Sequence, residues 1–410
     1  IALGGTGMKV NIRVRRRILN AIWGGNSQVQ HISDFPLVQF INFDLDSGEV
    51  TQDGKSVKTD VLAEQVAFTS EEKVIEPLHL SKYTHSIDEL NRHREVAEWF
   101  PLTPDKIKSL GIDPSKGAGQ IRALSRLYFF DKYPTIRDKL RDKVGRLLNN
   151  IGTQADKLKK LGLEIDPGKI RIVITGSAAG GTGSGSFLDM GYLAKAILKE
   201  NNISGKVDLF FVLPGGFNAF NTERVQANGY AALMELETCM RGNPLLKHWD
   251  ATDNLFIESR PYDDVFILDN GNVAQARTEN QEDIYEMVSD VLFTDFTSQD
   301  FANKKRSVAV NQNQFKIRSF DVSLPQDYGS DTKLRFPRAY SSVGQAVLDT
   351  QIDARQNVRL NQQVQHMLKA FFGVANAEVT GNRPTDKERD EFLKEQLTIT
   401  ARTFTDLPEF

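Results

Sequence analysis

The residues with the clearest chemical potential are glycines interleaved with hydroxyl side chains between positions 176 and 186. Glycine lets the backbone approach an anion closely and adopt positive φ angles, while neighbouring hydroxyl and backbone N–H groups donate hydrogen bonds. This composition predicts an anion-binding loop. The candidate ligand-binding residues in it are Gly180, Gly181, Thr182, Gly183, Ser184 and Gly185.

The flanking segments supply the elements that must position this loop. A β-branched run, Ile172–Ile174, precedes it and is typical of a buried parallel strand. Apolar residues at helical spacing follow it, from Phe187 to Leu198. Strand, glycine loop and helix in succession place the free N–H groups of a helix start beside the loop, where phosphate can bind.

The known phosphate motifs narrow the choice of fold. The lysine that a GxxxxGK[ST] motif requires is absent, and Ser186 stands where GxGxxG requires its third glycine. The segment AGGTGSG, residues 179–185, instead resembles the phosphate-loop signature of the tubulin/FtsZ superfamily over its whole length. An unrelated structural turn is the alternative. The resemblance implies an α/β fold: a GTPase domain with a parallel Rossmann-like sheet, a long central helix and a reduced or truncated C-terminal region.

Two further glycine loops occur in the order that the resemblance implies. The first follows the opening Ile-Ala-Leu segment, and the second opens the sequence KGAGQIRALSRLYFF at residues 116–130. We expect the second to sense the terminal phosphate, with charge added by Arg122 or Arg126. Lys9 stands where the family usually carries an amide and could reach a phosphate or be solvated. The expected phosphate contacts of these loops are Gly4, Gly5, Thr6, Gly7, Lys9, Gly117, Ala118 and Gly119.

An acidic segment follows the expected second strand, Val38–Phe43. Its FDLDSG sequence is similar to a tubulin loop whose acidic residues approach the nucleotide's Mg²⁺. Carboxylates beside a triphosphate suit a hard cation held through water, so Asp44 and Asp46 are the predicted magnesium residues, with an ordinary acidic turn as the alternative.

The resemblance also implies residues for the nucleoside and for catalysis. VFILDN at residues 265–270 is similar to a tubulin segment whose asparagine binds guanine, which places Asn270 on the base. Asp283, on the following helix, corresponds to the aspartate that reads guanine in FtsZ. Arg224 corresponds to an arginine beside the ribose or phosphate, with Glu223 as a substitute ribose contact. SQDFAN, at 298–303, matches the catalytic NxDFAD motif only in part, which makes Asp300 the candidate catalytic residue and Asp295 an alternative.

Composition excludes several functional classes. The chain has 410 residues, 40% of them hydrophobic and 26% charged, with a formal net charge of −3. This balance argues against a general nucleic-acid or membrane-surface binder. No apolar run is long enough to span a membrane, and a single cysteine, Cys239, suits a reducing compartment, so we expect a cytoplasmic protein. The chain begins at Ile1 rather than a methionine, and we expect residues upstream of it.

These patterns predict a nucleotide-binding domain over residues 1–300, with an insertion at 47–115, and a C-terminal α+β or helical region over 301–410. The predicted ligands are GTP or GDP with Mg²⁺. One hypothesis is a GTPase that self-associates into filaments, each site being completed by the neighbouring subunit. The other is a switch or scaffold that does not polymerise and contacts a protein partner through the insertion or the C-terminal helix. A dinucleotide-dependent enzyme fits poorly, because the glycine pattern is wrong and no ribose-binding acid follows at the usual spacing.

Overall fold

The structure is a computed structural model that describes residues 1–23, 31–45, 63–74, 78–84, 86–109, 117–160, 170–217, 222–241, 249–250, 260–271, 277–278, 280–297, 320–323, 333–336, 340–343, 352–371, 387 and 391. Contacts divide the chain into two compact units, Ile1–Gln345 and Ala346–Phe410. Each unit is described by itself below.

The first unit is built on a seven-stranded parallel sheet with the order β3-β2-β1-β4-β5-β6-β9. Strands β4 and β5 are the longest, and side chains of both are buried on the two faces of the sheet. The prediction of an α/β fold with a parallel Rossmann-like sheet is confirmed, and the sheet extends past residue 300 through β9. The strands are β1 (Ala2–Leu3), β2 (Asn42–Phe43), β3 (Lys73–Val74), β4 (Ile170–Ser177), β5 (Gly205–Val212), β6 (Asp264–Leu268) and β9 (Tyr340–Ser341).

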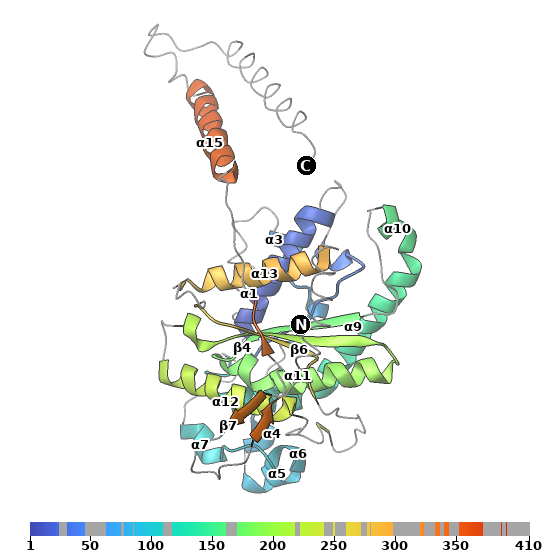
Figure 1. Ribbon diagram of the computed structural model, residues 1–410, viewed down its shortest axis with the longest axis vertical. Coiled ribbons are helices and arrows are strands. Elements are labelled where there is room, and N and C mark those ends of the chain that lie inside the picture. Colours follow the sequence, from blue (N-terminus) through green and yellow to red (C-terminus); the bar gives the residue numbers. More distant parts are fainter. Residues whose placement is uncertain are drawn as a thin grey trace. The chain divides into compact units, whose positions relative to one another are not determined.

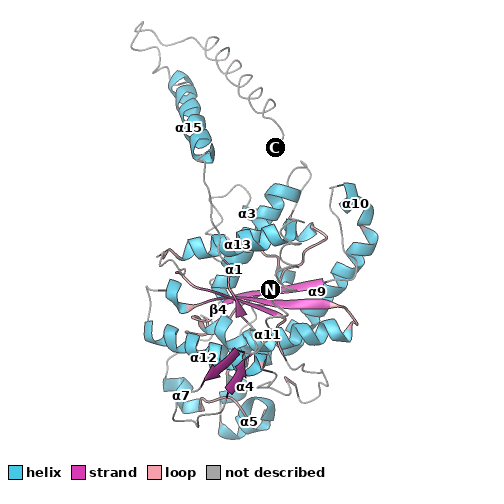
Figure 2. Cartoon of the chain, viewed as in Figure 1, coloured by secondary structure: helices cyan, strands magenta, loops and turns pink. Residues whose placement is uncertain are grey.

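Helices cover both faces of this sheet, which appears between two helical layers in Figure 1 and Figure 2. On one face, α1 and α13 bury Val10, Val14 and Val288 in one core with Phe210 of β5. On the other, α8, α9, α11 and α12 share a larger core that includes Phe211 of the same strand. Because successive side chains of a strand point to opposite faces, one sheet contributes residues to both cores.

The helices of the described residues vary widely in length. Short ones gather in the predicted insertion, and the long helices of the first unit flank the sheet. They are α1 (Gly4–Ile18), α3 (Ala63–Val66), α4 (Ser81–Thr84), α5 (Ile87–Arg92), α6 (Arg94–Ala97), α7 (Pro104–Ser109), α8 (Arg122–Asp131), α9 (Tyr133–Thr153), α10 (Ala155–Lys160), α11 (Gly181–Glu200), α12 (Thr222–Met240), α13 (Gln281–Thr297) and α15 (Ile352–Phe371), with a π-helical turn at Leu19–Trp23 and 3-10 turns at Ile32–Asp34, Ser70–Glu72 and Pro214–Gly216.

The insertion is less regular than its sequence predicts. A single helix over residues 86–100 is expected, and Ser86 does cap its start by accepting a hydrogen bond from the Glu89 N–H at 3.2 Å. The helix is interrupted at His93, whose backbone leaves the helical region (φ −97°, ψ 71°) while its ring packs against Tyr83 at 4.8 Å between centroids. Tertiary packing therefore overrides local helix propensity here.

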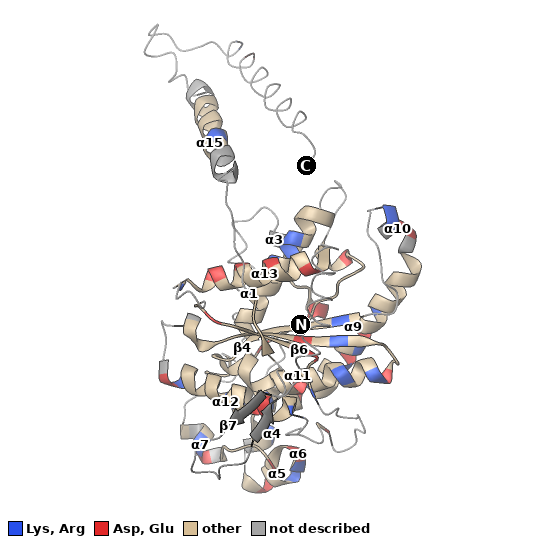
Figure 3. Ribbon diagram, viewed as in Figure 1, with Lys and Arg blue, Asp and Glu red and all other residues tan. Residues whose placement is uncertain are grey.

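Three strands, β7, β8 and β9, and the helix α15 follow α13 in the described residues. β7 (Phe320–Ser323) and β8 (Lys333–Phe336) pair as an antiparallel hairpin, and α15 belongs to the second unit. The sequence of residues 341–372 predicts one long helix; the structure has the helix α15 from Ile352 to Phe371, whereas Ser341 belongs to the strand β9. Figure 3 shows charges of both signs on the helices around a largely uncharged sheet. Within the described residues, no helix combines the length and apolar character that a membrane crossing requires.

Candidate functional site

A cavity of about 330 Å³ opens where the strand order reverses, at the carboxyl ends of β1 and β4. Ligands of open parallel sheets bind at this switch point because the loops that follow neighbouring strands diverge there. Residues from all three predicted glycine loops border it. Its lining consists of Leu3, Gly4, Gly5, Thr6, Lys9, Asp44, Gly117, Ala118, Gly119, Gln120, Ser177, Gly180, Gly181, Thr182, Gly183, Phe217, Gln281 and Tyr285.

The amino-terminal ends of two helices border the cavity. α1 begins at Gly4 and α11 at Gly181, directly after β1 and the loop that follows β4. Neither helix has a side-chain cap or an acidic residue in its first turn. The first N–H groups of a helix have no partner within the helix and carry partial positive charge, so these two starts together favour an anion.

The glycines of the two loops have different physical roles. Gly4 has a backbone φ of +68°, which residues other than glycine rarely adopt. A Cβ at Gly183 would lie 2.8 Å from the Ser177 carbonyl oxygen, so this glycine allows close packing of α11 on β4. A Cβ at Gly180 would meet nothing within 4 Å. Gly180 thus leaves open space on the cavity wall, which a ligand can occupy.

The predicted residues Gly7, Ser184 and Gly185 lie just behind this wall. A Cβ at Gly7 would lie 2.4 Å from the Thr175 carbonyl oxygen, so Gly7 packs α1 against β4. The Ser184 hydroxyl donates to the Gly180 carbonyl within α11. Gly185 faces the Arg122 carbonyl of α8, only 2.3 Å from where a Cβ would stand. These residues shape the loops from outside the cavity.

The third loop, residues 117–120, is held against the second. Gly117, Gly119 and Gln120 all have positive φ, at 101°, 54° and 60°. This turn brings Ala118 against Gly181, where an added Cβ would lie 2.8 Å from that of Ala118. The backbone of the third loop therefore reaches the start of α11.

The arginines expected to add charge to the third loop have structural partners instead. The Arg122 guanidinium donates to Glu235 of α12 and to the Ser184 carbonyl of α11. Arg126 pairs with the buried carboxylate of Asp189 at 3.1 Å. Neither arginine lines the cavity, and both fasten α8 to its neighbours.

Two polar residues of α12 position these loops. Arg224 Nη1 donates to the Gly119 carbonyl at 3.1 Å, so this predicted ligand contact lies against the loop rather than in the cavity lining. Asn228 was not anticipated. Its buried Nδ2 donates to the carbonyls of Gln120 at 2.9 Å and Ala179 at 3.2 Å, which ties the second and third loops together. Its position one helical turn after Arg224 is the signal that could have identified it.

Asp44 is the acidic residue in the described lining. It is 2% exposed and accepts a hydrogen bond from the Thr182 hydroxyl at 2.9 Å. The second predicted magnesium residue, Asp46, lies outside the described residues, within which no cluster of three metal-binding side chains occurs. A carboxylate and a hydroxyl oxygen are hard donors, and they fit an Mg²⁺ ion that completes its shell with water and phosphate oxygens.

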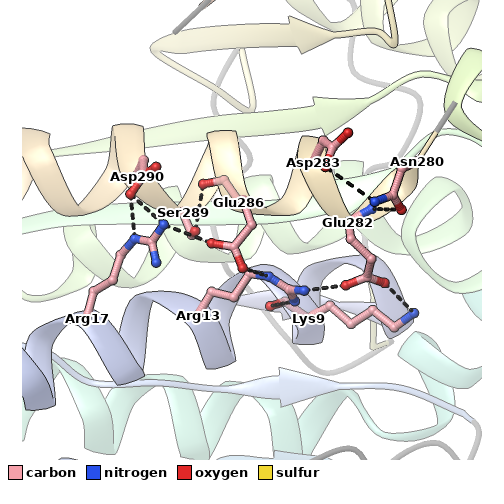
Figure 4. Close-up of polar contacts among 9 residues, drawn as sticks. All are labelled: Lys9, Arg13, Arg17, Asn280, Glu282, Asp283, Glu286, Ser289 and Asp290. Carbon is pink, nitrogen blue, oxygen red and sulfur yellow. Dashed lines mark hydrogen bonds and ion pairs between the residues drawn. The ribbon is translucent and has the colours of Figure 1, made fainter. Parts of the chain in front are cut away.

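α13 lines the cavity with residues other than the predicted one. Gln281 and Tyr285 stand one turn apart on the face toward the cavity, and the Tyr285 hydroxyl donates to Gln281 Oε1 at 3.2 Å. Asp283 lies about 200° around the helix from Gln281 at 100° per residue. Its carboxylate accepts hydrogen bonds from Thr278 and Asn280, as Figure 4 shows for Asn280. The structure therefore does not bring Asp283 to the cavity.

Asn270 is also outside the cavity lining. Its backbone N–H donates to Asp269 Oδ1 at 2.8 Å, and its carbonyl accepts from the Thr278 N–H at 2.9 Å. Its side-chain oxygen lies against Gly215, 2.7 Å from where a Cβ would stand. Asn270 thus organises the turn after β6 instead of facing the cavity.

Of the two catalytic candidates, only Asp295 is among the residues that the structure describes. Asp300 is outside the described residues. Asp295 is 6% exposed and forms an ion pair with Arg171 near the amino end of β4, whereas the cavity lies at the carboxyl end of that strand. Arg171 also pairs with Asp208 at 2.5 Å. Asp295 therefore joins α13 to the sheet in a structural contact.

Lys9 is the basic side chain in the described lining. Its Nζ lies 3.7 Å from Glu282 Oε1 and 5.5 Å from the centre of the Tyr285 ring. Arg13 and Arg17 continue this pairing of α1 with Glu282, Glu286 and Asp290 along α13 (Figure 4). The cavity wall made by α13 is thereby fixed to α1.

The family model described as "Tubulin like" matches residues 1–369 of this chain. Among solved structures, the chain is similar to CetZ1 from Haloferax volcanii in its GDP-bound monomer form, with 12% sequence identity. That similarity covers 80% of this chain and 73% of CetZ1, with a TM-score of 0.35. No curated protein sequence matches the chain. Because the family match spans most of the sequence, including all three glycine loops and the helix α13, the chain belongs to the tubulin-like family.

Proposed function

We propose that this chain binds a guanine nucleotide, GTP or GDP, in the cavity at the switch point of its sheet. The observation that carries the proposal is the meeting of two uncapped helix starts, α1 and α11, with a third glycine loop around one cavity. The backbone N–H groups of these two first turns, in which no acidic residue stands, suit a chain of phosphates. Membership in the tubulin-like family favours guanine as the base.

The phosphates would lie against the first turns of α1 and α11, and Mg²⁺ would bind beside them. Asp44 and the Thr182 hydroxyl would hold the cation, largely through water. When bound, Mg²⁺ neutralises part of the phosphate charge. The buried position of Asp44 keeps its carboxylate fixed toward the loop, so the chain itself orients this corner of the site.

We propose that Gln281, rather than Asp283 or Asn270, contacts the base. Its amide is on the cavity wall, and the Tyr285 hydroxyl fixes its orientation. An amide can donate to the guanine carbonyl or accept from the ring N–H, whereas adenine presents a different edge. Gln281→Ala should therefore lower the preference for GTP over ATP by about 10-fold, the value of roughly one hydrogen bond. Asp283→Ala is the matched comparison, and a larger loss of preference in that variant would refute this assignment.

We further propose that GTP hydrolysis requires self-association. Within the described lining Asp44 is the one carboxylate, and it already accepts from Thr182, so a further carboxylate to orient the attacking water would come from another part of the chain or from a second copy. Asp300, in the segment that resembles the family's catalytic loop, is the proposed source. The water oxygen would bond to the γ-phosphorus while the bond to the bridging oxygen breaks and GDP leaves.

Phosphate release from Mg-GTP, measured per molecule over a series of protein concentrations, tests this proposal. Specific activity that rises steeply above a threshold concentration would support a site completed between subunits. A constant low rate would contradict it and indicate a self-contained site. The Asp300→Ala variant should bind GTP as the original chain does but release phosphate more slowly.

The second candidate function is a GTP- or GDP-binding switch or scaffold that contacts a protein partner. The helix α15 of the second unit favours it, because its apolar side chains Val358, Val364 and Leu368 are exposed. Tight nucleotide binding without phosphate release at any concentration would support this function. The buried single cysteine, Cys239, fits action in a reducing compartment such as the cytoplasm.

A further inference from the structure

The Lys9 ammonium group lies within reach of both Glu282 and the cavity. Its side chain is 44% exposed and lines the cavity beside the first turn of α1, while its Nζ lies 3.7 Å from Glu282 on α13. A long, half-exposed ion pair of this kind holds its partners weakly. An anion that entered the cavity would compete with Glu282 for the same ammonium group.

Glu282 does not depend on Lys9 for its charge balance. The Arg13 guanidinium forms an ion pair with the same carboxylate and another with Glu286 at 2.7 Å. Figure 4 shows Glu282 between Lys9 and Arg13, with Arg17 serving the next turns of α13. Lys9 can therefore leave Glu282 without exposing an uncompensated carboxylate, and the remaining pairs keep α1 and α13 together.

We propose that Lys9 exchanges between Glu282 and a phosphate of the bound nucleotide, so that Glu282 is a competitor within the chain that sets the affinity for phosphorylated ligands. The inference rests on the proposed nucleotide site and adds the residue that limits its affinity. A lysine is a flexible point charge with a hydrated ammonium group, which suits such an exchange better than the rigid fork of an arginine. Glu282 touches Lys9 and acts on the ligand only through it.

Binding of GDP and of guanosine to the full chain, measured by calorimetry or equilibrium dialysis at several salt concentrations, tests the exchange. Lys9→Gln should weaken GDP binding by about 10-fold, since it removes one charged hydrogen bond, and should leave guanosine binding unchanged. Lys9→Arg should retain most of the GDP affinity. Glu282→Gln should strengthen GDP binding by about 2- to 5-fold, since it removes a weak competing pair.

The double variant Lys9→Gln, Glu282→Gln separates exchange from general electrostatics. If Glu282 acts through Lys9, removing its charge has no further effect once Lys9 is gone. An equal effect of Glu282→Gln in both backgrounds, or an unchanged GDP affinity in Lys9→Gln, would overturn the exchange. Arg17→Gln is the control, because it breaks pairs in the same row two turns from the cavity and should not alter GDP binding. A parent chain that binds neither ligand would instead refute the nucleotide site itself.

Discussion

The open space at Gly180 allows ligand binding to be separated from folding. Gly180 is the residue before α11, with φ −79° and ψ 172°, which alanine adopts without strain. Apart from its two chain neighbours, a Cβ there would meet no atom of the described residues within 4 Å. Gly180→Ala should therefore fold normally, while its methyl group projects into the space where we place a phosphate.

The expected size of the two effects follows from the geometry. Alanine is a poorer N-cap than glycine, which costs some tenths of a kcal/mol, but it restricts the unfolded chain, which contributes about 0.4–1 kcal/mol in the opposite direction. The stability should change by less than about 0.5 kcal/mol. A displaced phosphate would lose one or two charged hydrogen bonds of about 1.5–3 kcal/mol each, so nucleotide affinity should fall at least about 10-fold.

Urea denaturation and GDP binding, measured on the same preparations, test this prediction. Normal stability with weakened binding is the expected pair of results. Normal stability with unchanged GDP affinity would refute the placement of a phosphate at the start of α11. Reduced stability would show that the space beside Gly180 is occupied by the chain itself.

Two further predictions concern stability alone. In Gly185→Ala the new methyl group would meet the Arg122 carbonyl oxygen at 2.3 Å, so the forced separation of α11 from α8 should lower the stability by about 1–3 kcal/mol. Gly145 lies in open space on α9, so Gly145→Ala should raise the stability by up to about 1 kcal/mol. Urea denaturation of both variants measures the contrast. In Glu72→Gln the fully buried guanidinium of Arg15 loses its partner at 2.9 Å, and stability at neutral pH should fall by about 3–5 kcal/mol. Equal effects of the two glycine variants, or a Glu72→Gln chain as stable as the original, would contradict the packing described here.

The buried ion pair between Arg15 and Glu72 also makes the folding stability depend on pH. Burial opposes ionisation of Glu72, but Arg15 and the Thr69 N–H stabilise the carboxylate and hold its pKa below the usual range. A carboxyl group whose pKa is lowered by folding adds stability above its unfolded pKa of about 4.3, and this contribution is lost as the pH falls through the folded value. The stability difference between the original chain and Glu72→Gln should therefore narrow below about pH 4.3. Glu98→Gln, at an exposed pair with Arg94, is the control and should show little effect at any pH.

The glycine loops that line the cavity were predictable from sequence because they are local features. Strand, loop and helix follow one another directly at Gly4 and at Gly181, so the residues that line the cavity lie next to the residues that identify them. Asp44 was found for the same reason, since it follows β2 immediately. The parallel sheet then brings these ends together, because all its strands point the same way.

The side of the cavity that α13 lines was not predictable in the same way. Asp283 and Gln281 are two residues apart, yet that separation turns a side chain to another face of a helix, and the sequence does not define how α13 is rotated against the sheet. Asn228 acts through contacts with loops far away in the chain, and Tyr285 lines the cavity beside Lys9 of α1, so neither carries a local signature. The roles of Arg122 and Arg126 also depended on partners, Glu235 and Asp189, that only the packing of the helices supplies.

The most direct test of the account is the equilibrium binding of GTP, GDP and ATP to the purified chain in the presence of Mg²⁺, with Gly180→Ala measured in parallel. We expect one GTP or GDP per chain, weaker binding of ATP, and a loss of affinity for all three in the variant. Binding of ATP as tight as that of GTP would contradict the assignment of guanine. No nucleotide binding, or binding that Gly180→Ala leaves unchanged, would contradict the placement of the nucleotide in this cavity.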